Sequence, residues 1–343
     1  MLRHLAAAVL AFAAAVTATP AEAAPALVPA ADREVVFTAD GTTAHGTLHV
    51  PEHRAGQRLK AALLLPGSGP TDRDGNQPPA SSPDTLAQLA DALAGDGIVT
   101  LRFDKYGTGR TGLGAYRDHP ERLDYPAFVR QARAAYEELR DQPETDPHAL
   151  LIVGHSEGAM TALLLGGTVR PRPAGLALLQ PQAIRMLDLV ELQLEAQIAE
   201  ATRQGQFTPE QQRTVNAAVA AAVTALRAHR PVDTTDLPRP IAQLFEAFQG
   251  PIARFVRSDD AVYPPDTAAQ LRPGTRVLLT CGTNDAQVPC ATTDALTAAL
   301  RQARAGRPGR VTLPAVDHLM HDSGHPDTLA PSLLDALHRL TRR

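Results

Sequence analysis

The chain has no tryptophan, and aromatic residues make up only 4% of its 343 residues. Surfaces that bind sugars or nucleobases by stacking need aromatic side chains, so this scarcity argues against such a surface. Charge is also nearly balanced, with a formal net charge of −4 and no long basic or acidic run. A nucleic-acid partner is therefore not expected.

Beyond the N-terminal region, no apolar run reaches transmembrane length. The N-terminal segment itself begins with Arg3, continues with an apolar stretch from Leu5 to Val16, and ends in the small-x-small sequence Ala21-Glu22-Ala23. This order predicts a secretory signal peptide over residues 1–23, because the apolar stretch is too short to span a bilayer. The mature protein is expected in the periplasm or the medium, without a stable membrane anchor.

Cysteine is scarce, with Cys281 and Cys290 as the two examples. In an oxidising compartment, two cysteines at this short separation predict a disulfide bond. A pair of buried free thiols is the alternative.

Most of the chain alternates short apolar runs with segments of helical periodicity. This alternation predicts an α/β fold with a mostly parallel sheet and helices on both faces, formed by residues 24–181 and 264–343. Asp40-Gly41, in the middle of the segment from Glu34 to Pro51, predicts a β-hairpin.

Residues 182–263 interrupt this alternation, because they contain helical patterns and no good strand. One helix opens with Thr208, Pro209 and Gln211, which form a capping box with proline at the first helical position. A further helix is expected over Ile241 to Val256. A single crossover helix needs far fewer residues, so the segment predicts an inserted helical cap whose inner face accepts a modest apolar group.

The sequence Gly154-His155-Ser156-Glu157-Gly158 stands between a predicted strand and a predicted helix. It fits G-x-S-x-G, a sharp strand-to-helix turn that exposes a strained serine hydroxyl. A plain turn in which Ser156 caps the helix is the alternative. His155 is expected to pack behind the turn.

A nucleophilic serine needs a base and a carboxylate that orients the base. Asp285 follows an apolar strand, and His318 follows the last predicted strand, so both lie at strand ends in the order serine, acid, histidine. Other candidates are Asp259 and Asp294 as the acid, and His321 and His325 as the base or as metal ligands. No second ligand cluster accompanies these histidines, so a metal site is not predicted.

An oxyanion hole usually consists of two backbone N–H groups, one from the residue after the nucleophile. These are expected to be the N–H groups of Glu157 and of Ser68, which follows Gly67 in a glycine-containing loop. The nearby charged residues are predicted to support this loop or to form a solvated turn: Asp72, Arg73 and Asp74. Asp104 and Arg110 are expected to shape the floor of the pocket.

Five segments in order, PGSGPTDRDGN, RFDKYGTGRT, GHSEG, GTNDAQVP and VDHLM, resemble the α/β-hydrolase superfamily. Within it, the segments resemble exported carboxylesterase-like members near the serine aminopeptidase-like branch. It covers nearly all of the mature chain except the cap. It implies hydrolysis of a small-molecule carboxylic ester with neither a metal nor an organic cofactor. Asp317 and Tyr106 depart from residues common in similar enzymes, and either could alter the pocket.

Two other functions stay open. A peptidase or amidase needs an acidic pocket for a free amine, and the cap offers Glu191, Glu195 and Glu200, although these also fit a solvated helix face. A catalytically silent binding protein on the same scaffold is the other alternative. Such proteins typically lose a member of the triad or the oxyanion loop, and this sequence retains candidates for both.

Overall fold

The computed structural model describes residues 26–305 and 309–342. The predicted signal peptide, residues 1–23, lies outside the described residues. Eight strands form one sheet in the order β10-β9-β8-β7-β5-β6-β3-β2. In chain order these strands are β2 (Ala31–Ala39), β3 (Thr42–Val50), β5 (Leu59–Leu65), β6 (Val99–Phe103), β7 (Thr145–His155), β8 (Gly175–Leu179), β9 (Val277–Gly282) and β10 (Arg310–Leu313). The short strands β1 (Leu27–Val28) and β4 (His53–Arg54) pair separately.

The sheet is antiparallel at one edge and parallel elsewhere. β2 and β3 form the predicted hairpin, and its turn residues Asp40 and Gly41 have φ of 47° and 74°. β3 pairs antiparallel with β6, and all pairs from β6 to β10 are parallel. The carboxyl ends of the parallel strands therefore share one edge of the sheet, where ligands bind in open α/β sheets.

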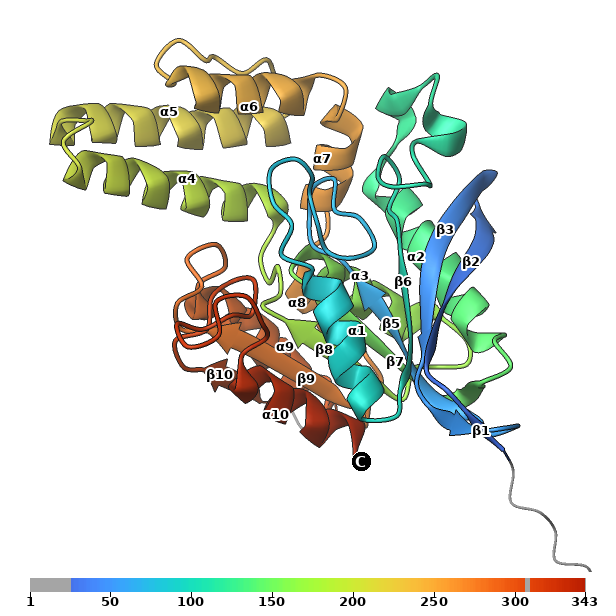
Figure 1. Cartoon of the computed structure of the whole chain (residues 1–343). Helices are drawn as coiled ribbons and strands as arrows, with labels where there is room; N and C mark the ends of the chain where they lie inside the picture. The colour runs from blue at the N-terminus through green and yellow to red at the C-terminus, as the bar shows by residue number, and fades with distance from the viewer. Residues whose placement is uncertain (1–25, 306–308, 343) are drawn as a thin grey trace, which may run out of the picture.

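Helices cover both faces of this sheet (Figure 1). One face packs against α1 (Thr85–Gly95) and α10 (Pro331–Thr341), and the other against α2 (Tyr125–Arg140), α3 (Glu157–Thr168), α8 (Pro264–Ala269) and α9 (Asp294–Gln302). Alternate residues of β5 divide between the two cores, with Leu63 in one and Leu64 in the other. This follows from the period of two along a strand. Burial on both faces explains why the parallel strands read as continuous apolar runs.

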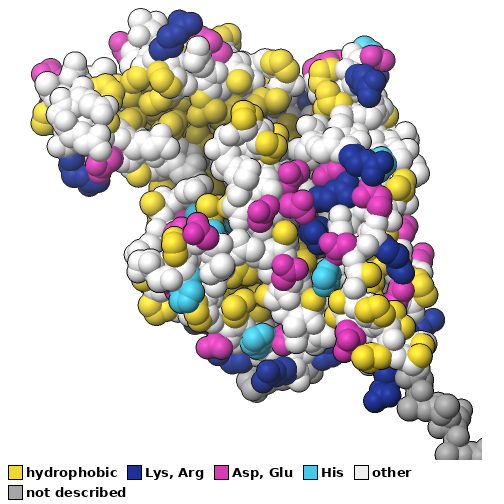
Figure 2. All heavy atoms as spheres, in the orientation of Figure 1, with side chains coloured by type: hydrophobic (Ala, Val, Ile, Leu, Met, Phe, Trp, Pro, Cys, Tyr) yellow, Lys and Arg dark blue, Asp and Glu magenta, His cyan; other side chains and the backbone are white. Residues whose placement is uncertain are grey.

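The chain leaves the sheet after β8 and returns at β9, and between them lies the helical cap. Its helices are α4 (Met186–Arg203), α5 (Pro209–Arg227), α6 (Arg239–Gln249) and α7 (Ala253–Asp260). They enclose an apolar core of their own, in which Val219 and Phe245 are fully buried. Figure 2 shows hydrophobic side chains gathered on the cap and the surface indented where the cap meets the rest of the molecule.

Two expectations about the cap have different outcomes. The capping box at the start of α5 is present, with Thr208 and Gln211 exchanging side-chain and backbone hydrogen bonds. The single helix expected over Ile241 to Val256 is wrong, because α6 ends at Gln249 and α7 begins at Ala253. The intervening Gly250-Pro251 explains the break, since proline disfavours helical backbone at the residue before it. Throughout residues 26–305 and 309–342, no helix combines the length and apolar character needed to cross a bilayer.

Candidate active site

Ser156 lies at the turn from β7 into α3, in a conformation that non-glycine residues rarely adopt. Its φ of 54° and ψ of −119° are strained for an L-residue. The flanking glycines permit the turn: a Cβ on Gly154 would lie 2.1 Å from the Gly158 carbonyl oxygen, and one on Gly158 would lie 2.3 Å from the Leu65 carbonyl oxygen. The strand and helix therefore cross too closely for any side chain at these two positions.

Ser156 and His318 line the same cavity, which has a volume of about 310 Å³. His318 follows β10, and its Nδ1 lies 2.9 Å from Oδ2 of Asp285. A carboxylate only accepts hydrogen bonds, so His318 donates from Nδ1, and its Nε2 carries the free lone pair. The other oxygen of Asp285 accepts from the N–H groups of Gln287 at 3.0 Å and Val288 at 2.7 Å. These bonds compensate the burial of the carboxylate.

His155 supports His318 from behind the turn, as its position next to the serine suggested. Its Nε2 donates to the backbone carbonyl of His318 at 2.8 Å, and the two ring centroids are 4.8 Å apart. Burial, and secondarily the neighbouring His318, lower the pKa of His155 to about 3. His155 is therefore neutral near pH 7, and it fixes the backbone that carries His318.

The two expected oxyanion donors lie beside Ser156. Glu157 is the first residue of α3, so its N–H has no acceptor within the helix. Gly67 packs against the serine, because a Cβ there would lie 3.2 Å from the Ser156 Cβ. The next residue, Ser68, lines the cavity, and its carbonyl accepts from Thr71 and Gln77, both at 2.9 Å. Within the described residues, the N–H of Ser68 donates to no protein acceptor.

A model of the alpha/beta hydrolase family matches residues 62–332 of the chain. The chain belongs to the alpha/beta hydrolase family. Two curated relatives, both uncharacterized proteins from Mycobacterium tuberculosis strains, are 34% identical over 165 residues, which is 48% of this chain and 50% of theirs. The chain thus spans about half the length of the curated relatives it matches.

Solved structures of esterases share the fold. The Pyrococcus furiosus esterase Pf2001 is 13% identical, with a TM-score of 0.58 over 93% of this chain and 96% of its own. Est1E from Butyrivibrio proteoclasticus, solved with ferulic acid, is 17% identical, with a TM-score of 0.52 over 90% and 96%. The alpha/beta hydrolase GrgF from Penicillium sp. sh18 is 18% identical, with a TM-score of 0.56 over 92% and 99%. These comparisons confirm the expected superfamily and fold, and they support a hydrolase in general.

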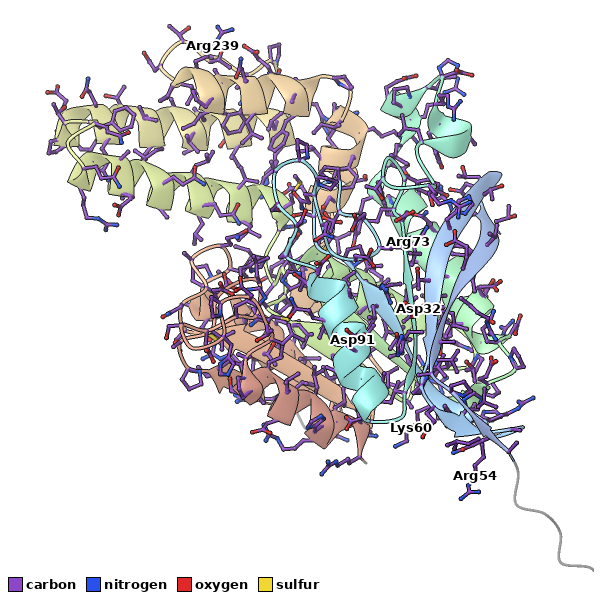
Figure 3. The ribbon with its side chains drawn as sticks, in the orientation of Figure 1. Asp32, Arg54, Lys60, Arg73, Asp91 and Arg239 are labelled. Atoms are coloured by element: carbon purple, nitrogen blue, oxygen red, sulfur yellow. A yellow bond between two sulfur atoms is a disulfide. The ribbon has the colours of Figure 1, made fainter. Side chains whose placement is uncertain are left out.

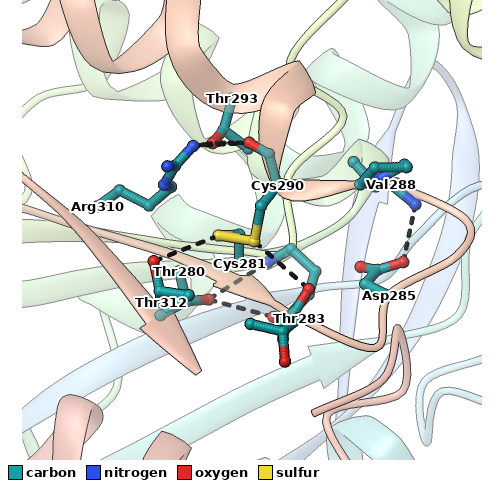
Figure 4. The surroundings of a disulfide bond; sticks show 12 residues. Thr280, Cys281, Thr283, Asp285, Val288, Cys290, Thr293, Arg310 and Thr312 are labelled. Carbon is teal, nitrogen blue, oxygen red and sulfur yellow. Dashed lines mark hydrogen bonds between the residues drawn. A yellow bond between two sulfur atoms is a disulfide. The ribbon is translucent and has the colours of Figure 1, made fainter. Parts of the chain in front are cut away.

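In this hydrolase, a disulfide bond closes the loop that carries the candidate acid, Asp285 (Figure 4). Cys281, on β9, and Cys290 form a disulfide with a Cα–Cα distance of 5.2 Å, which confirms the predicted pairing. Asp285 lies on the loop that this bond closes. Arg310 of β10 donates to the Cys290 carbonyl at 2.7 Å, and Gly282 approaches Val316 so closely that a Cβ would lie 2.1 Å from its carbonyl oxygen. The acid loop therefore packs directly on the segment that leads to His318.

The charged residues after Ser68, of which Figure 3 labels Arg73, support the loop. Arg73 is largely buried, and it pairs with Asp104 through two side-chain bonds of 3.1 and 2.8 Å. Asp72 accepts from the N–H of Asp74 at 2.9 Å, and Asp74 pairs with Arg102 at 2.7 Å. Burial alone would raise the pKa of Asp104, but bonds from Arg73 and from a backbone N–H lower it. Asp72 thus makes an internal contact of the loop, whereas Arg73 and Asp74 tie the loop to the end of β6.

Three expectations about the pocket are wrong. Asp104 and Arg110 do not form its floor, because Asp104 is bonded to Arg73 and Arg110 is exposed beside Glu34. Among the described residues, no cap residue lines the cavity at Ser156. The lining comes mainly from the loop and helix start between residues 66 and 86, because these lie directly over the end of β7.

The remaining candidates lie apart from the cavity. Tyr106 donates to the carbonyl of Ala39 at 3.0 Å, and Asp317 caps a turn by accepting from the His321 N–H at 2.9 Å. Asp294 pairs with Arg310. The cavity-lining residues include none of these, nor the three cap glutamates, Glu191, Glu195 and Glu200.

Sequence reasoning missed a buried charged cluster behind the oxyanion donors. Nζ of Lys105 donates to the Gly67 carbonyl at 2.6 Å and lies 3.8 Å from Oε1 of Glu157. Asp259, from cap helix α7, is fully buried, and it accepts from Gln182 at 3.1 Å. Burial lowers the pKa of Lys105 and raises the pKa of both carboxyl groups. The charge of Glu157 raises the pKa of Asp259 further, whereas Lys105 and a hydrogen bond from Asp259 act to lower the pKa of Glu157. The one available signal was that lysine occurs only twice in the chain.

Proposed function

We propose that this hydrolase cleaves carboxylic esters with a short to medium acyl group through a triad of Ser156, His318 and Asp285. One observation carries the proposal: the strained Ser156 opens on the same cavity as His318, whose Nδ1 is held by Asp285. A nucleophile, a base and an orienting carboxylate at one site are what acyl transfer by serine requires.

In the first half of the reaction, Oγ of Ser156 attacks the acyl carbonyl carbon and its proton passes to Nε2 of His318. Asp285 keeps the imidazole in the required tautomer and stabilises its positive charge. The negative charge on the former carbonyl oxygen is held by the N–H groups of Ser68 and Glu157. The carbon–oxygen bond to the alcohol then breaks, and the alcohol leaves with the proton from His318.

In the second half, a water molecule attacks the acyl-enzyme. His318 takes the proton of the water, the same N–H groups hold the second oxyanion, and the proton returns to Oγ of Ser156 as the carboxylic acid leaves. Each turnover consumes one ester and one water and yields one acid and one alcohol, without an external cofactor.

The size and lining of the cavity support a small substrate. Its volume is about 310 Å³, at the low end for small-molecule sites. The part of the lining that comes from residues 66–86 includes hydroxyl and amide side chains: Ser68, Thr71, Gln77, Ser81 and Thr85. A short ester with polar substituents fits this lining better than a long alkyl chain. Gln287 lines both this cavity and a second hollow of about 670 Å³ beneath α4, so the second hollow lies next to the site.

Hydrolysis of p-nitrophenyl esters from acetate to palmitate tests the proposal, with Ser156→Ala as the control. We expect turnover of the short esters, loss of turnover in the variant, and labelling of Ser156 by a fluorophosphonate probe. Labelling without ester turnover would indicate an amide or peptide substrate. A folded protein with neither would contradict the proposal and favour a silent scaffold.

We further propose that the hydrolase acts after export and removal of residues 1–23. The disulfide supports this location, because such bonds persist mainly in oxidising compartments. Mass spectrometry of the protein recovered from the periplasm or medium should find an N-terminus at Ala24. Recovery of the intact chain from the cytoplasm alone would contradict the proposal.

A further inference from the structure

We propose that Lys105 is a positioning residue that aims both backbone donors of the oxyanion hole. The inference rests on the proposed ester hydrolysis and adds a residue that does not itself touch the substrate. Acyl transfer by a serine triad does not itself require such a lysine. The role is inferred from the contacts that Lys105 makes with Gly67 and Glu157.

The first contact acts on the peptide group between Gly67 and Ser68. The carbonyl of Gly67 and the N–H of Ser68 belong to one planar trans unit, so they point in opposite directions. Nζ of Lys105 donates to that carbonyl at 2.6 Å from the side away from the cavity. By holding the oxygen, Lys105 fixes the direction of the N–H, and it also polarises the peptide group in the sense that strengthens the donor.

The second contact acts on the other donor. Oε1 of Glu157 lies 3.8 Å from Nζ of Lys105, and both side chains are largely buried. The N–H of Glu157 belongs to the same residue, at the first position of α3. Lys105 therefore links the loop that carries one oxyanion donor to the helix that carries the other.

Lys105 is itself held firmly. It is the second residue after β6, and its neighbour Asp104, the first, accepts from the backbone N–H of Arg73 at 3.1 Å. The carbonyl of Lys105 accepts from the side chain of Thr108 at 3.0 Å. Two consecutive residues at the end of one strand thus fix the oxyanion loop at Gly67 and at Arg73, so the loop is located relative to the sheet.

A buried ion pair could instead serve only the stability of the fold. Oxyanion positioning differs from that role in its kinetic signature, because the charge on the oxygen develops only in the transition state. A misaimed donor should therefore lower kcat and leave KM nearly unchanged. A loss of stability alone would lower the amount of folded enzyme and would alter neither constant per folded site.

The experiment compares Lys105→Met with Lys60→Met in the full-length mature protein. Lys60 is the only other lysine of the sequence, and it donates to the Thr341 carbonyl at the same distance of 2.6 Å, at the opposite end of the sheet. We expect Lys105→Met to lower kcat for p-nitrophenyl acetate about ten- to a hundredfold, less than the full loss of one oxyanion donor, with KM changed by less than about twofold. Lys60→Met should leave both constants unchanged.

Binding of a trifluoromethyl ketone supplies a second readout, because its adduct with Ser156 places an oxyanion in the same hole. Its affinity should fall by the same factor as kcat in Lys105→Met and stay unchanged in Lys60→Met. Unchanged kcat and ketone affinity in folded Lys105→Met, or a change confined to KM, would overturn the role of Lys105. Absence of hydrolysis and of fluorophosphonate labelling in the wild type would instead overturn the proposed function and this role with it.

Lys105→Met leaves the Glu157 carboxylate buried without its cation and could fail to fold. The same substitution is therefore made in a Glu157→Gln background and compared with Glu157→Gln alone. The positioning role predicts that kcat of the double variant is about ten- to a hundredfold lower than kcat of Glu157→Gln alone. This loss is again smaller than the loss expected when one oxyanion donor is missing. An equal kcat in the two variants would overturn it.

Discussion

The sheet edge that carries the candidate site and the helical cap above it are built by different interactions. At the sheet edge, Ser156, Asp285 and His318 follow three parallel strands, and crossings too close for side chains at Gly154, Gly158 and Gly282 set their spacing. The cap instead has an apolar core of its own.

The cap is joined to the core by a few polar and aromatic contacts. Ser258 accepts from the Tyr125 N–H at 2.8 Å, Arg254 pairs with Asp124 at 3.1 Å, and the ring of Phe255 packs edge-to-face on Tyr125 and Phe128. The buried apolar residues of the cap nevertheless form a cluster separate from the two clusters on the faces of the sheet. The difference indicates that the reacting groups are fixed by the sheet, whereas the cap is a separable unit.

The largest expected effect is at the sheet edge. Asp285→Asn keeps the shape of the acid but removes the charge that fixes the tautomer of His318. We expect kcat to fall about 10⁴-fold, as in serine enzymes with the same arrangement, with a normal circular dichroism spectrum. Asp294→Asn is the control, because the Asp294 side chain is exposed and pairs with Arg310 outside the cavity. Equal loss of activity in the two variants would show that Asp285 is not the acid.

A substitution in the cap core tests whether the cap is separable. Phe245 is fully buried in the cap, so Phe245→Ala should cost about 3–5 kcal/mol of local stability. Hydrogen exchange followed by mass spectrometry should show faster exchange in α4 to α6 and unchanged exchange in β7 and β8. Ile252→Ala, at an exposed position of the cap, is the control. Uniformly faster exchange would show instead that cap and sheet unfold as one unit.

Removing the disulfide tests how far the loop that carries Asp285 depends on its covalent closure. Replacing Cys281 and Cys290 by serine removes a constraint on the unfolded chain worth about 2–3 kcal/mol for so short a loop. We expect a lower Tm and, because Asp285 lies within that loop, a lower kcat. Wild-type protein with verified reduction of the bond should behave in the same way. Unchanged Tm and kcat in both preparations would show that the hydrogen bonds of the loop suffice.

At neutral pH the smallest effect is expected at His155, because its contribution to stability changes only below its ordinary pKa. Its pKa is about 3 in the folded protein against an ordinary 6.5. Between these values the unfolded chain binds a proton that the folded protein excludes, so stability falls as the pH falls from 6.5 towards 3, by up to about 1.4 kcal/mol per pH unit. His155→Gln removes the titration and keeps a donor for the His318 carbonyl.

Urea unfolding at several pH values measures this slope. The curve of His155→Gln should be flatter than that of the wild type. His229→Gln, at an exposed position of the cap, retains His155 and should keep the wild-type slope. Parallel curves for His155→Gln and the wild type would contradict a neutral buried His155.

The sequence predicted the parts of the molecule that depend on local pattern. Strand apolarity, the Asp40-Gly41 turn, the capping box at Thr208 and the strand-end positions of Asp285 and His318 are all properties of short segments. The pairing of Cys281 with Cys290 was also predictable, because the sequence has only two cysteines and they lie nine positions apart.

The parts that it missed depend on contacts between distant segments. Lys105 and Gly67 are 38 positions apart, and Glu157 is brought to them only by the packing of α3 behind the loop. Asp259 was weighed only as an alternative acid, because nothing local shows that α7 places it in the interior. The pocket lining was misassigned for the same reason: residues 66–86 fold over the end of β7, and no periodicity reveals that.

The position of the cap in the strand order has a consequence for how such a chain changes over generations. The insertion leaves at the end of β8 and returns at β9, and these two strands are direct neighbours. Helices can be gained, lost or exchanged there without breaking any strand pairing of the sheet. Lengthening a surface connection also costs little free energy. A lineage can thus exchange the cap by recombination at one point of the gene while the sheet that carries Ser156, Asp285 and His318 is inherited intact.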